Sequence, residues 1–112
     1  MKPEIKTCLH DIKVSIDSVQ EYIGTDITFT SFQKNKILRR AIEREIEIIG
    51  EATNRILKID PEFKIENSRK IIDTRNWVIH SYDNVDEVII WSIVINHLPK
   101  LKQEVEQYLK EE

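Results

Sequence analysis

Hydrophobic residues recur at steps of three and four over the first 23 residues of the chain. The apolar positions in this stretch are Ile5, Leu9, Ile12, Ile16, Val19 and Ile23. This spacing is typical of one face of an amphipathic helix. Gly24 follows directly and suits a helix C-terminal cap, where glycine is the favoured residue. The pattern therefore predicts a first helix over residues 4–23, and the following TDITFT is expected to form a loop.

A second, longer helix is predicted over residues 31–59. Thr30 and Gln33 have the spacing of a capping box, and no turn signal follows until Asp60-Pro61. The expected inner stripe consists of Ile37, Ala41, Glu45, Ile48 or Ile49, Ala52 and Ile56. The stretch REIEIIG alternates like a strand, and isoleucine favours strands. The unbroken helical pattern on both sides outweighs that preference.

Gly50 stands in the middle of this predicted helix. Glycine in a helix interior costs roughly 1 kcal/mol relative to alanine. Close approach of another helix explains such a glycine more readily than a functional role does. We therefore expect a neighbouring helix to pass near this position.

A third helix is predicted to begin near Asn67 or Ser68 and to run into RNWVIHSY, residues 75–82. Asp83-Asn84 is the expected break after it, and Asn84 with Glu87 has the spacing of another N-terminal box. These signals place an arginine, a histidine and a tyrosine near the C-terminal end of one helix.

The fourth helix contains VIIWSIVI, residues 88–95, which is apolar almost all round and is expected to be buried on several sides. Pro99 should kink or end it, and a helical pattern continues to the C-terminus. Long helices with short connections predict an all-α fold, an antiparallel bundle of four to five helices. The 112 residues fit a single domain over residues 1–112.

Composition narrows the function classes. Charged residues make up 33% of the chain and the net charge is −3, without the basic excess of a dedicated nucleic-acid binder. Any contact with RNA should therefore be local. The single Cys8 fits a reducing compartment, and no apolar run approaches the roughly 18 residues of a membrane span. We expect a cytoplasmic protein without a membrane partner.

The spacing of the motif raises a geometric question. At about 100° per residue, Arg75 and His80 point about 140° apart on a regular helix, whereas Tyr82 returns to within about 20° of Arg75. The helix could loosen near Ser81-Tyr82, or it could carry a wide turn at the motif. Alternatively, a neighbouring helix or a second subunit could complete a cleft. We favour the cleft, because a two-fold interface can bring both copies of the pair into one groove.

An arginine and a histidine without a metal cluster suit one kind of chemistry. The arginine fork matches phosphate and stabilises developing charge, and histidine exchanges a proton near neutral pH. Together they suit metal-independent RNA cleavage, in which the 2′-hydroxyl of the substrate attacks the adjacent phosphate. Asn76 could hold the substrate or orient the histidine. The spacing alone, however, favours a salt bridge and a hydrogen-bonded structural histidine over a catalytic pair.

Three stretches together resemble a known family. RNWVIHSY fits the Arg-x4-His-x-Tyr signature of the HepT-like branch of the HEPN superfamily. RRAIEREIEIIGEATNRI, residues 39–56, resembles the second helix of that branch, and VDEVIIWSIVINHLPKL resembles its segment after the motif. The similarity extends over essentially the whole chain, in the same order. Many relatives have a Pro-Trp pair shortly before the motif, where this chain has IENSRKIIDTRN.

The resemblance implies a HEPN bundle that forms a homodimer with the motif in the dimer cleft. It also implies the toxin half of a toxin–antitoxin pair, a metal-independent ribonuclease whose partner is an MntA-type nucleotidyltransferase antitoxin. Arg75 and His80 would be the catalytic pair, Asn76 a supporting residue, and Tyr82 the tyrosine that the partner adenylylates. Phosphates attached to Tyr82 beside Arg75 would repel an RNA backbone. The alternative is a non-catalytic subunit that binds a nucleotide or docks the nucleotidyltransferase.

Glu51 and Arg44 each have two interpretations. Glu51 either faces the motif helix and orients Arg75 by pairing with it, since a buried arginine needs a partner, or it faces solvent. Arg44 is either a second phosphate contact or, more in keeping with its neighbours, one arm of an ion pair with Glu47 or Glu51.

The remaining candidates have mainly structural interpretations. His10 and His97 lack ligand spacing such as His-x3-His, so no metal site and no cofactor are expected. Trp77 and Trp91 are expected to be core or dimer-interface anchors rather than stacking platforms for bases. The densest basic patch consists of Lys34, Lys36, Arg39 and Arg40. It could contact a negatively charged partner or RNA, but a solvated face is the default expectation.

Overall fold

The structure is a computed structural model that describes residues 1–66, 68–80 and 87–111, with residues 77–80 described by their backbone. Its elements are α1 (Pro3–Ile23), α2 (Phe29–Lys34), α3 (Lys36–Ile59), α4 (Ser68–His80), α5 (Glu87–Ser92), the π-helical turn η1 (Ile93–His97) and α6 (Leu98–Lys110). Within these described ranges the regular elements are all helical, REIEIIG included. The all-α prediction is confirmed.

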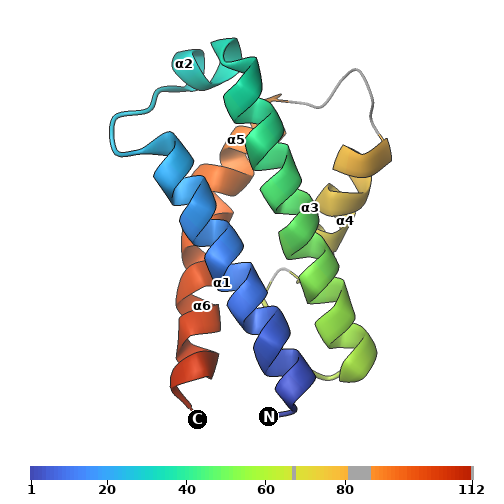
Figure 1. The fold of residues 1–112 in the computed structure, drawn as a ribbon. Helices are drawn as coiled ribbons and strands as arrows, with labels where there is room; N and C mark the ends of the chain where they lie inside the picture. Colours follow the sequence, from blue (N-terminus) through green and yellow to red (C-terminus); the bar gives the residue numbers. More distant parts are fainter. Residues whose placement is uncertain (67, 81–86, 112) are drawn as a thin grey trace.

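The long helices run alternately up and down (Figure 1). α1 and α4 ascend, while α3 and the continuous α5–η1–α6 segment descend. α1 packs against both α3 and α6, and α3 packs against α4 on its other side. α1 begins and α6 ends at the same end of the bundle. The expected antiparallel arrangement is therefore confirmed, and it leaves α4 at the side of the molecule, away from α1.

α1 has the predicted apolar stripe. The first five stripe residues are almost completely buried, and Ile23 is half-buried. Gly24 ends the helix with φ of 64°, and its backbone N–H donates to the Gln20 carbonyl at 3.0 Å. Cys8 lies in the core beside the stripe, where burial raises the pKa of its thiol.

The prediction of one unbroken helix over residues 31–59 is wrong, because Asn35 separates α2 from α3. Asn35 is extended, and its side-chain Oδ1 accepts from the Leu38 backbone N–H at 3.0 Å, capping α3. The capping box also lies two residues earlier than expected. Thr28 Oγ1 accepts from the Ser31 N–H at 3.1 Å, and Ser31 Oγ accepts from the Thr28 N–H at 3.2 Å. Short polar side chains compete for backbone donors in this way and so interrupt helices.

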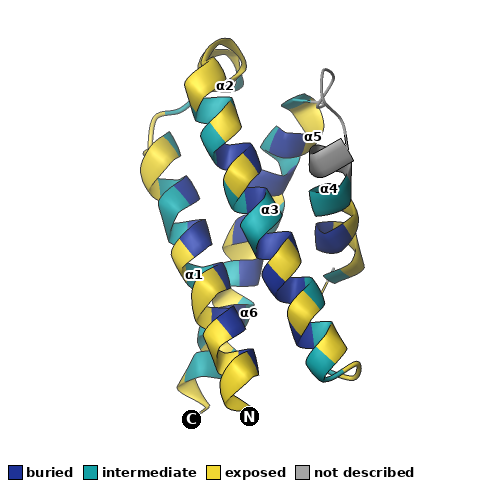
Figure 2. Cartoon of the chain, turned by 45° about the vertical axis from the view of Figure 1, so that its right-hand side comes forward, coloured by how far each residue is buried: buried dark blue, intermediate teal, exposed yellow. Residues whose placement is uncertain are grey.

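The lower part of the predicted α3 stripe is confirmed, because Ile49, Ala52 and Ile56 are buried. In the upper part, Ile42 and Ile46 are buried instead of Ala41 and Glu45. The buried residues form the dark band along α3 in Figure 2. Ile37 is 84% exposed. Glu45 is only half-buried, at the edge that faces α1, where Ser15 Oγ and the Tyr22 hydroxyl donate to its carboxylate at 2.7 and 2.8 Å. Taking Ile37 as the first core position shifted the upper part of the predicted stripe.

The segment after the motif is less buried than predicted. Ile90, Ile93 and Val94 lie in the core, but Val88, Ile89 and Ile95 are 62%, 44% and 42% exposed. One side of α5–η1 therefore presents large apolar side chains on the surface.

The helical segment does not end at Pro99, one of the two outcomes expected of it. Pro99 lies in the first turn of α6, directly after the wide turn η1. Proline has no backbone N–H, and its ring crowds the carbonyl four residues earlier. The local widening of the helix relieves that conflict. None of the helices within the described ranges is long and apolar enough to cross a membrane.

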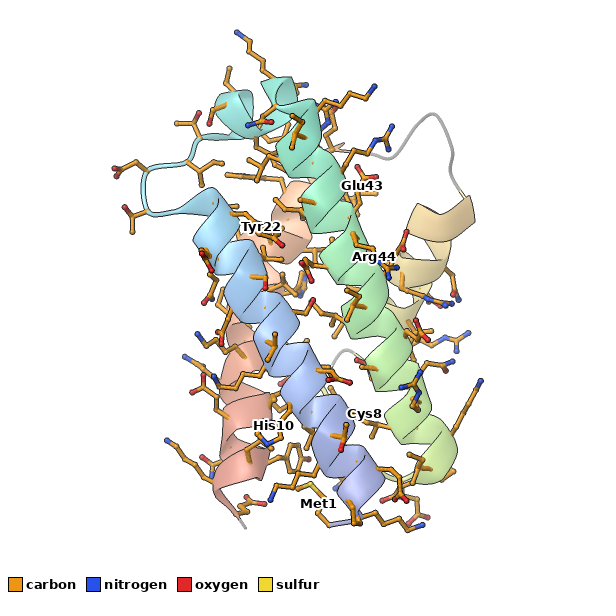
Figure 3. All side chains as sticks on the ribbon, in the orientation of Figure 1. Met1, Cys8, His10, Tyr22, Glu43 and Arg44 are labelled. Carbon is orange, nitrogen blue, oxygen red and sulfur yellow. The ribbon has the colours of Figure 1, made fainter. Side chains whose placement is uncertain are left out.

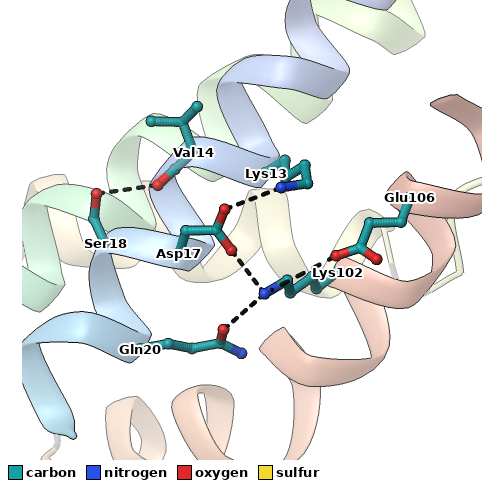
Figure 4. Close-up of polar contacts among 7 residues, drawn as sticks. All are labelled: Lys13, Val14, Asp17, Ser18, Gln20, Lys102 and Glu106. Carbon is teal, nitrogen blue, oxygen red and sulfur yellow. Dashed lines mark hydrogen bonds and ion pairs between the residues drawn. The ribbon is translucent and has the colours of Figure 1, made fainter.

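A polar network fastens α1 to α6 (Figure 4). The Lys102 ammonium lies 2.8 Å from Asp17 Oδ1, donates to Gln20 Oε1 at 3.0 Å, and approaches Glu106 at 4.0 Å. Lys13 donates to Asp17 Oδ2 at 3.1 Å. The two ammonium groups, Lys102 first, hold the pKa of the Asp17 carboxyl below its ordinary value.

Candidate functional site

α4 carries the candidate site. It begins at Ser68, as predicted, and stays α-helical through His80. A wide turn between Arg75 and His80, one of the three arrangements considered, is therefore absent from this described helix. The possible loosening at Ser81-Tyr82, the break at Asp83-Asn84 and the box at Asn84 fall outside the described residues, as does Tyr82 itself. The side chains of Trp77 and His80 also lie outside them.

Arg75 lies against the backbone of α3 at Gly50. A Cβ built on Gly50 would be 2.2 Å from Arg75 Cβ, 2.6 Å from Arg75 Cγ and 3.2 Å from the Ile71 carbonyl oxygen. Real Cβ atoms essentially never come within 3.0 Å of such neighbours. The absence of a side chain at Gly50 thus allows α4 to pack this close to α3. The predicted close approach of another helix is confirmed. The approaching helix is the motif helix, and the contact is made by the motif arginine.

The guanidinium of Arg75 is held close to its own helix. Its Nη1 donates to Asn76 Oδ1 at 2.8 Å. Neighbouring residues on a helix do not normally face each other, so this bond requires the long arginine side chain to curl back. Arg75 Nε is buried and has no hydrogen-bond partner among the described residues. Among the described residues, Asn76 is therefore the polar group that orients the arginine head.

Glu51 does not supply the expected partner for Arg75. Its Oε1 lies 3.2 Å from Arg55 Nη2, one helical turn further along α3, and both side chains are more than half exposed. The solvent-facing alternative for Glu51 is the one observed. In the stretch IIGEA, residues 48–52, Gly50 contacts Arg75 instead. The sequence indicated this contact only through the presence of a glycine in a helix interior.

A shallow pocket of ≈ 460 Å³ lies beside α4, lined by Arg69, Lys70, Asp73, Thr74 and Ile89. Arg69 Nε pairs with Asp73 at 3.4 Å. The α5 residue among the lining side chains is Ile89, which links the pocket to the exposed apolar side of that helix. Basic side chains on α4 thus border the site one to two turns before Arg75.

His97 links η1 to α4. Its Nε2 lies 3.1 Å from Lys70 Nζ, where the neutral imidazole accepts from the ammonium. Burial, followed by the charges of Lys70 and Lys100, lowers the pKa of His97. His10 is exposed on α1 (Figure 3). The described part of the chain holds no group of three or more His, Cys, Asp or Glu side chains placed to bind a metal ion.

The other charged candidates are paired or solvated. Arg44 on α3 (Figure 3) pairs with Glu47 at 3.1 Å, as the ion-pair interpretation predicted. In the basic patch, Arg39 lies 3.6 Å from Glu87 and Arg40 lies 3.0 Å from Glu43. The two lysines of the patch are exposed.

Trp91 is a packing residue in this chain. Its ring centroid lies 5.9 Å from that of Phe29 and 5.2 Å from that of Phe32. The aromatic cluster joins α5 to α2 and fits the prediction of a structural anchor.

An all-α antiparallel bundle that carries Arg-x4-His on one helix is the architecture expected of a HEPN-like domain. Comparison with known proteins agrees with it. Residues 12–108 match the family described as "Ribonuclease HepT-like".

Several curated proteins are similar over nearly their whole length. "Putative RNase MJ1380" of Methanocaldococcus jannaschii is 38% identical over 107 residues, covering 94% of this chain and 96% of the relative. "Putative RNase TTE0752" of Caldanaerobacter subterraneus subsp. tengcongensis is 31% identical over 115 residues, covering 99% and 96%. "Probable ribonuclease HepT" of Thermococcus cleftensis is 32% identical over 114 residues, covering 98% and 100%. No solved structure gives a significant match. The chain belongs to the HepT-like ribonuclease family.

Proposed function

We propose that the protein is a metal-independent endoribonuclease, the toxin component of a toxin–antitoxin pair, with Arg75 and His80 as its catalytic pair. The family and the ribonuclease names of its relatives support RNA as the substrate class. The observation that carries the proposal is how the Arg75 side chain is held. Its stem lies against α3 at Gly50 and its head is bonded to Asn76, so a charged fork is oriented before any phosphate arrives.

In the proposed reaction the 2′-hydroxyl oxygen of the RNA attacks the neighbouring phosphorus, and the bond to the 5′-oxygen breaks. The products are a 2′,3′-cyclic phosphate and a free 5′-hydroxyl. Arg75 stabilises the negative charge that develops on the phosphoryl oxygens. His80 donates a proton to the departing 5′-oxygen, and the proton that leaves the 2′-hydroxyl passes to water, which returns a proton to His80. Asn76 keeps the guanidinium in place through the step.

The test is RNA cleavage by the purified protein in the presence of a metal chelator. Arg75→Ala and His80→Ala should each lower the rate by about 100-fold or more. Arg55→Ala is the matched control, because Arg55 lies on α3, is exposed and pairs with Glu51 outside the pocket beside α4. If both motif variants stay folded and cleave RNA as fast as the control, Arg75 and His80 are not the catalytic pair. If the parent protein itself does not cleave RNA, the non-catalytic binding subunit is the function supported.

The proposal includes a homodimer in which the motif helices of two copies share a cleft. The exposed apolar side chains of α5–η1, next to the α4 pocket, support an interface on this side of the molecule. A two-fold interface would use this surface on both copies. Ile95→Lys should convert a dimer to monomer in sedimentation, whereas Val14→Lys, at an even more exposed apolar position on α1, should not. A monomeric parent protein contradicts the shared cleft.

The proposal also includes silencing by an MntA-type nucleotidyltransferase, which adenylylates Tyr82. Adenylyl groups there would place negative phosphates near Arg75 and exclude the RNA backbone. Intact mass after incubation with the partner and ATP should increase by one or more AMP units. Tyr82→Phe should abolish the increase. Tyr22→Phe, which removes an exposed tyrosine on α1, should leave it intact, and the reverse result refutes modification at Tyr82.

A further inference from the structure

We infer that Gly50 is a positioning residue for Arg75, acting through shape rather than through a hydrogen bond. This inference rests on the proposed ribonuclease function. Gly50 would set where the guanidinium lies relative to the bound phosphate, although it touches neither substrate nor reacting atoms.

The separation of α3 and α4 at this point depends on the missing side chain. With a Cβ on Gly50, the distances to Arg75 Cβ and Cγ would be 2.2 and 2.6 Å. Neither atom is the free end of a side chain. Cβ is fixed by the α4 backbone, and Cγ is one bond further along. The Ile71 carbonyl, one turn earlier on α4, would also be tightly approached, at 3.2 Å. Any other residue at position 50 must therefore move α4 or redirect the arginine stem.

The polar contacts of Arg75 do not fix the stem by themselves. Its Nε is buried without a partner among the described residues, and the bond to Asn76 holds only the far end. Glu51, the neighbouring carboxylate that could have bonded the arginine, pairs with Arg55. The part of Arg75 between Cβ and Nε is thus held by packing against α3. Catalysis is sensitive to such placement, since an error of 1 Å can lower a rate by about 100-fold.

The sharpest variant is Gly50→Ala, which adds one methyl group. It should lower kcat for RNA cleavage by about 100-fold with a smaller effect on KM, because the arginine acts mainly in the transition state. The control is Gly24→Ala. It adds the same methyl where nothing lies within 4 Å, and it strains the backbone through φ of +64°. It therefore reproduces a loss of stability without touching α4, and its cleavage rate should equal that of the parent.

The rate of hydrogen exchange at the arginine Nε–H, followed by spectroscopy, tests how the Arg75 side chain is held without measuring catalytic activity. The buried Nε–H of Arg75 should exchange with water more slowly than that of Arg69, whose side chain is 84% exposed. Arg75→Lys removes the signal and so assigns it. In Gly50→Ala the exchange should become fast, whereas in Gly24→Ala it should stay slow.

The outcomes separate this inference from the proposed function. If the parent protein does not cleave RNA, the proposed ribonuclease function is wrong. The exchange rates of the Arg75 Nε–H then still decide whether Gly50 positions Arg75. If the parent is active, Arg75→Ala is inactive and Gly50→Ala matches Gly24→Ala, the positioning role is wrong. If Gly50→Ala does not fold, the parent alone decides, because an Arg75 Nε–H that exchanges as fast as that of Arg69 overturns the inference.

Discussion

α4 rests on α3, and α6 rests on α1, but the two contacts are built differently. Between α1 and α6, the Lys102 ammonium lies among Asp17, Gln20 and Glu106, and each contact involves an oppositely charged or polar partner. Between α3 and α4, the closest approach is that of Arg75 to Gly50, and the buried Nε–H of Arg75 has no partner in the described structure.

The difference indicates that the α1–α6 contact is structural, whereas the α3–α4 contact positions a residue of the candidate site. A buried donor without a partner costs about 1–3 kcal/mol, and a contact selected only for stability would avoid that loss, for example with an apolar side chain at position 75. Departures of this kind are concentrated at functional positions. The α1–α6 network has the opposite character, since the Lys102 ammonium lies 2.8 Å from the Asp17 carboxylate and 4.0 Å from that of Glu106, near the surface.

Arg75→Met should sharpen the comparison most. Methionine keeps an unbranched stem against Gly50 and removes the guanidinium, including the Nε–H that has no partner among the described residues. RNA cleavage should fall by about 100- to 1000-fold, while the free energy of unfolding should be unchanged or higher by about 1 kcal/mol. Initial cleavage rates and urea denaturation measure the two effects. A large loss of stability would mean that the arginine head is a structural group after all.

The same change at the other contact, Lys102→Met, should give the reverse result. The free energy of unfolding should fall only slightly, because the group is near the surface and screened by solvent, and the cleavage rate should not change. Urea denaturation with an unchanged m value would identify a pure stability effect. Lys110→Met, which removes an exposed lysine at the end of α6, controls for the loss of one charge.

Acid should weaken the α1–α6 contact in a defined pH range. The folded-state pKa of Asp17 is lowered from its ordinary value of 3.8, mainly by Lys102. Between the two pKa values the unfolded chain binds more protons, so the stability from this pair is complete above 3.8 and is lost as pH falls through the lowered pKa. The melting temperature of Lys102→Met, measured at successive pH values below 3.8, should decline less than that of the parent. If the melting temperatures of the two proteins decline in parallel as pH falls, Lys102 does not lower the pKa of Asp17.

The sequence predicted the elements of the fold better than their boundaries. The stripe of α1 and the cap at Gly24 were correct, because spacing and backbone conformation are local properties. The break at Asn35 was missed, since an asparagine inside a helical pattern gives no sign of whether its side chain caps the following turn. The exposed side of α5–η1 was also missed, because an apolar run does not reveal which of its sides faces the rest of the bundle.

At the candidate site, the sequence located the helix and the arginine but not what holds the arginine. Pairing Arg75 with Glu51 followed from the rule that a buried charge needs a partner. The structure uses Asn76 for the head and the absence of a side chain at Gly50 for the stem. Packing of this kind depends on the distance between α3 and α4. The spacing of residues along the sequence of either helix does not give that distance.

A third contact, Lys70 with His97, joins α4 to η1 and should show the smallest effect. Burial and the charges of Lys70 and Lys100 lower the pKa of His97 from 6.5, and Glu66 and Glu104 line the same small pocket. Because the unfolded chain binds the proton more tightly, the contribution of His97 to stability is complete above pH 6.5 and is lost as pH falls through the lowered pKa. His97→Gln keeps an acceptor for Lys70 without this titration, so its melting temperature should fall less than that of the parent on acidification below pH 6.5. His10 and His80 remain in both proteins and cancel in the difference. An equal fall in both would show that folding does not lower the pKa of His97, against its burial beside Lys70.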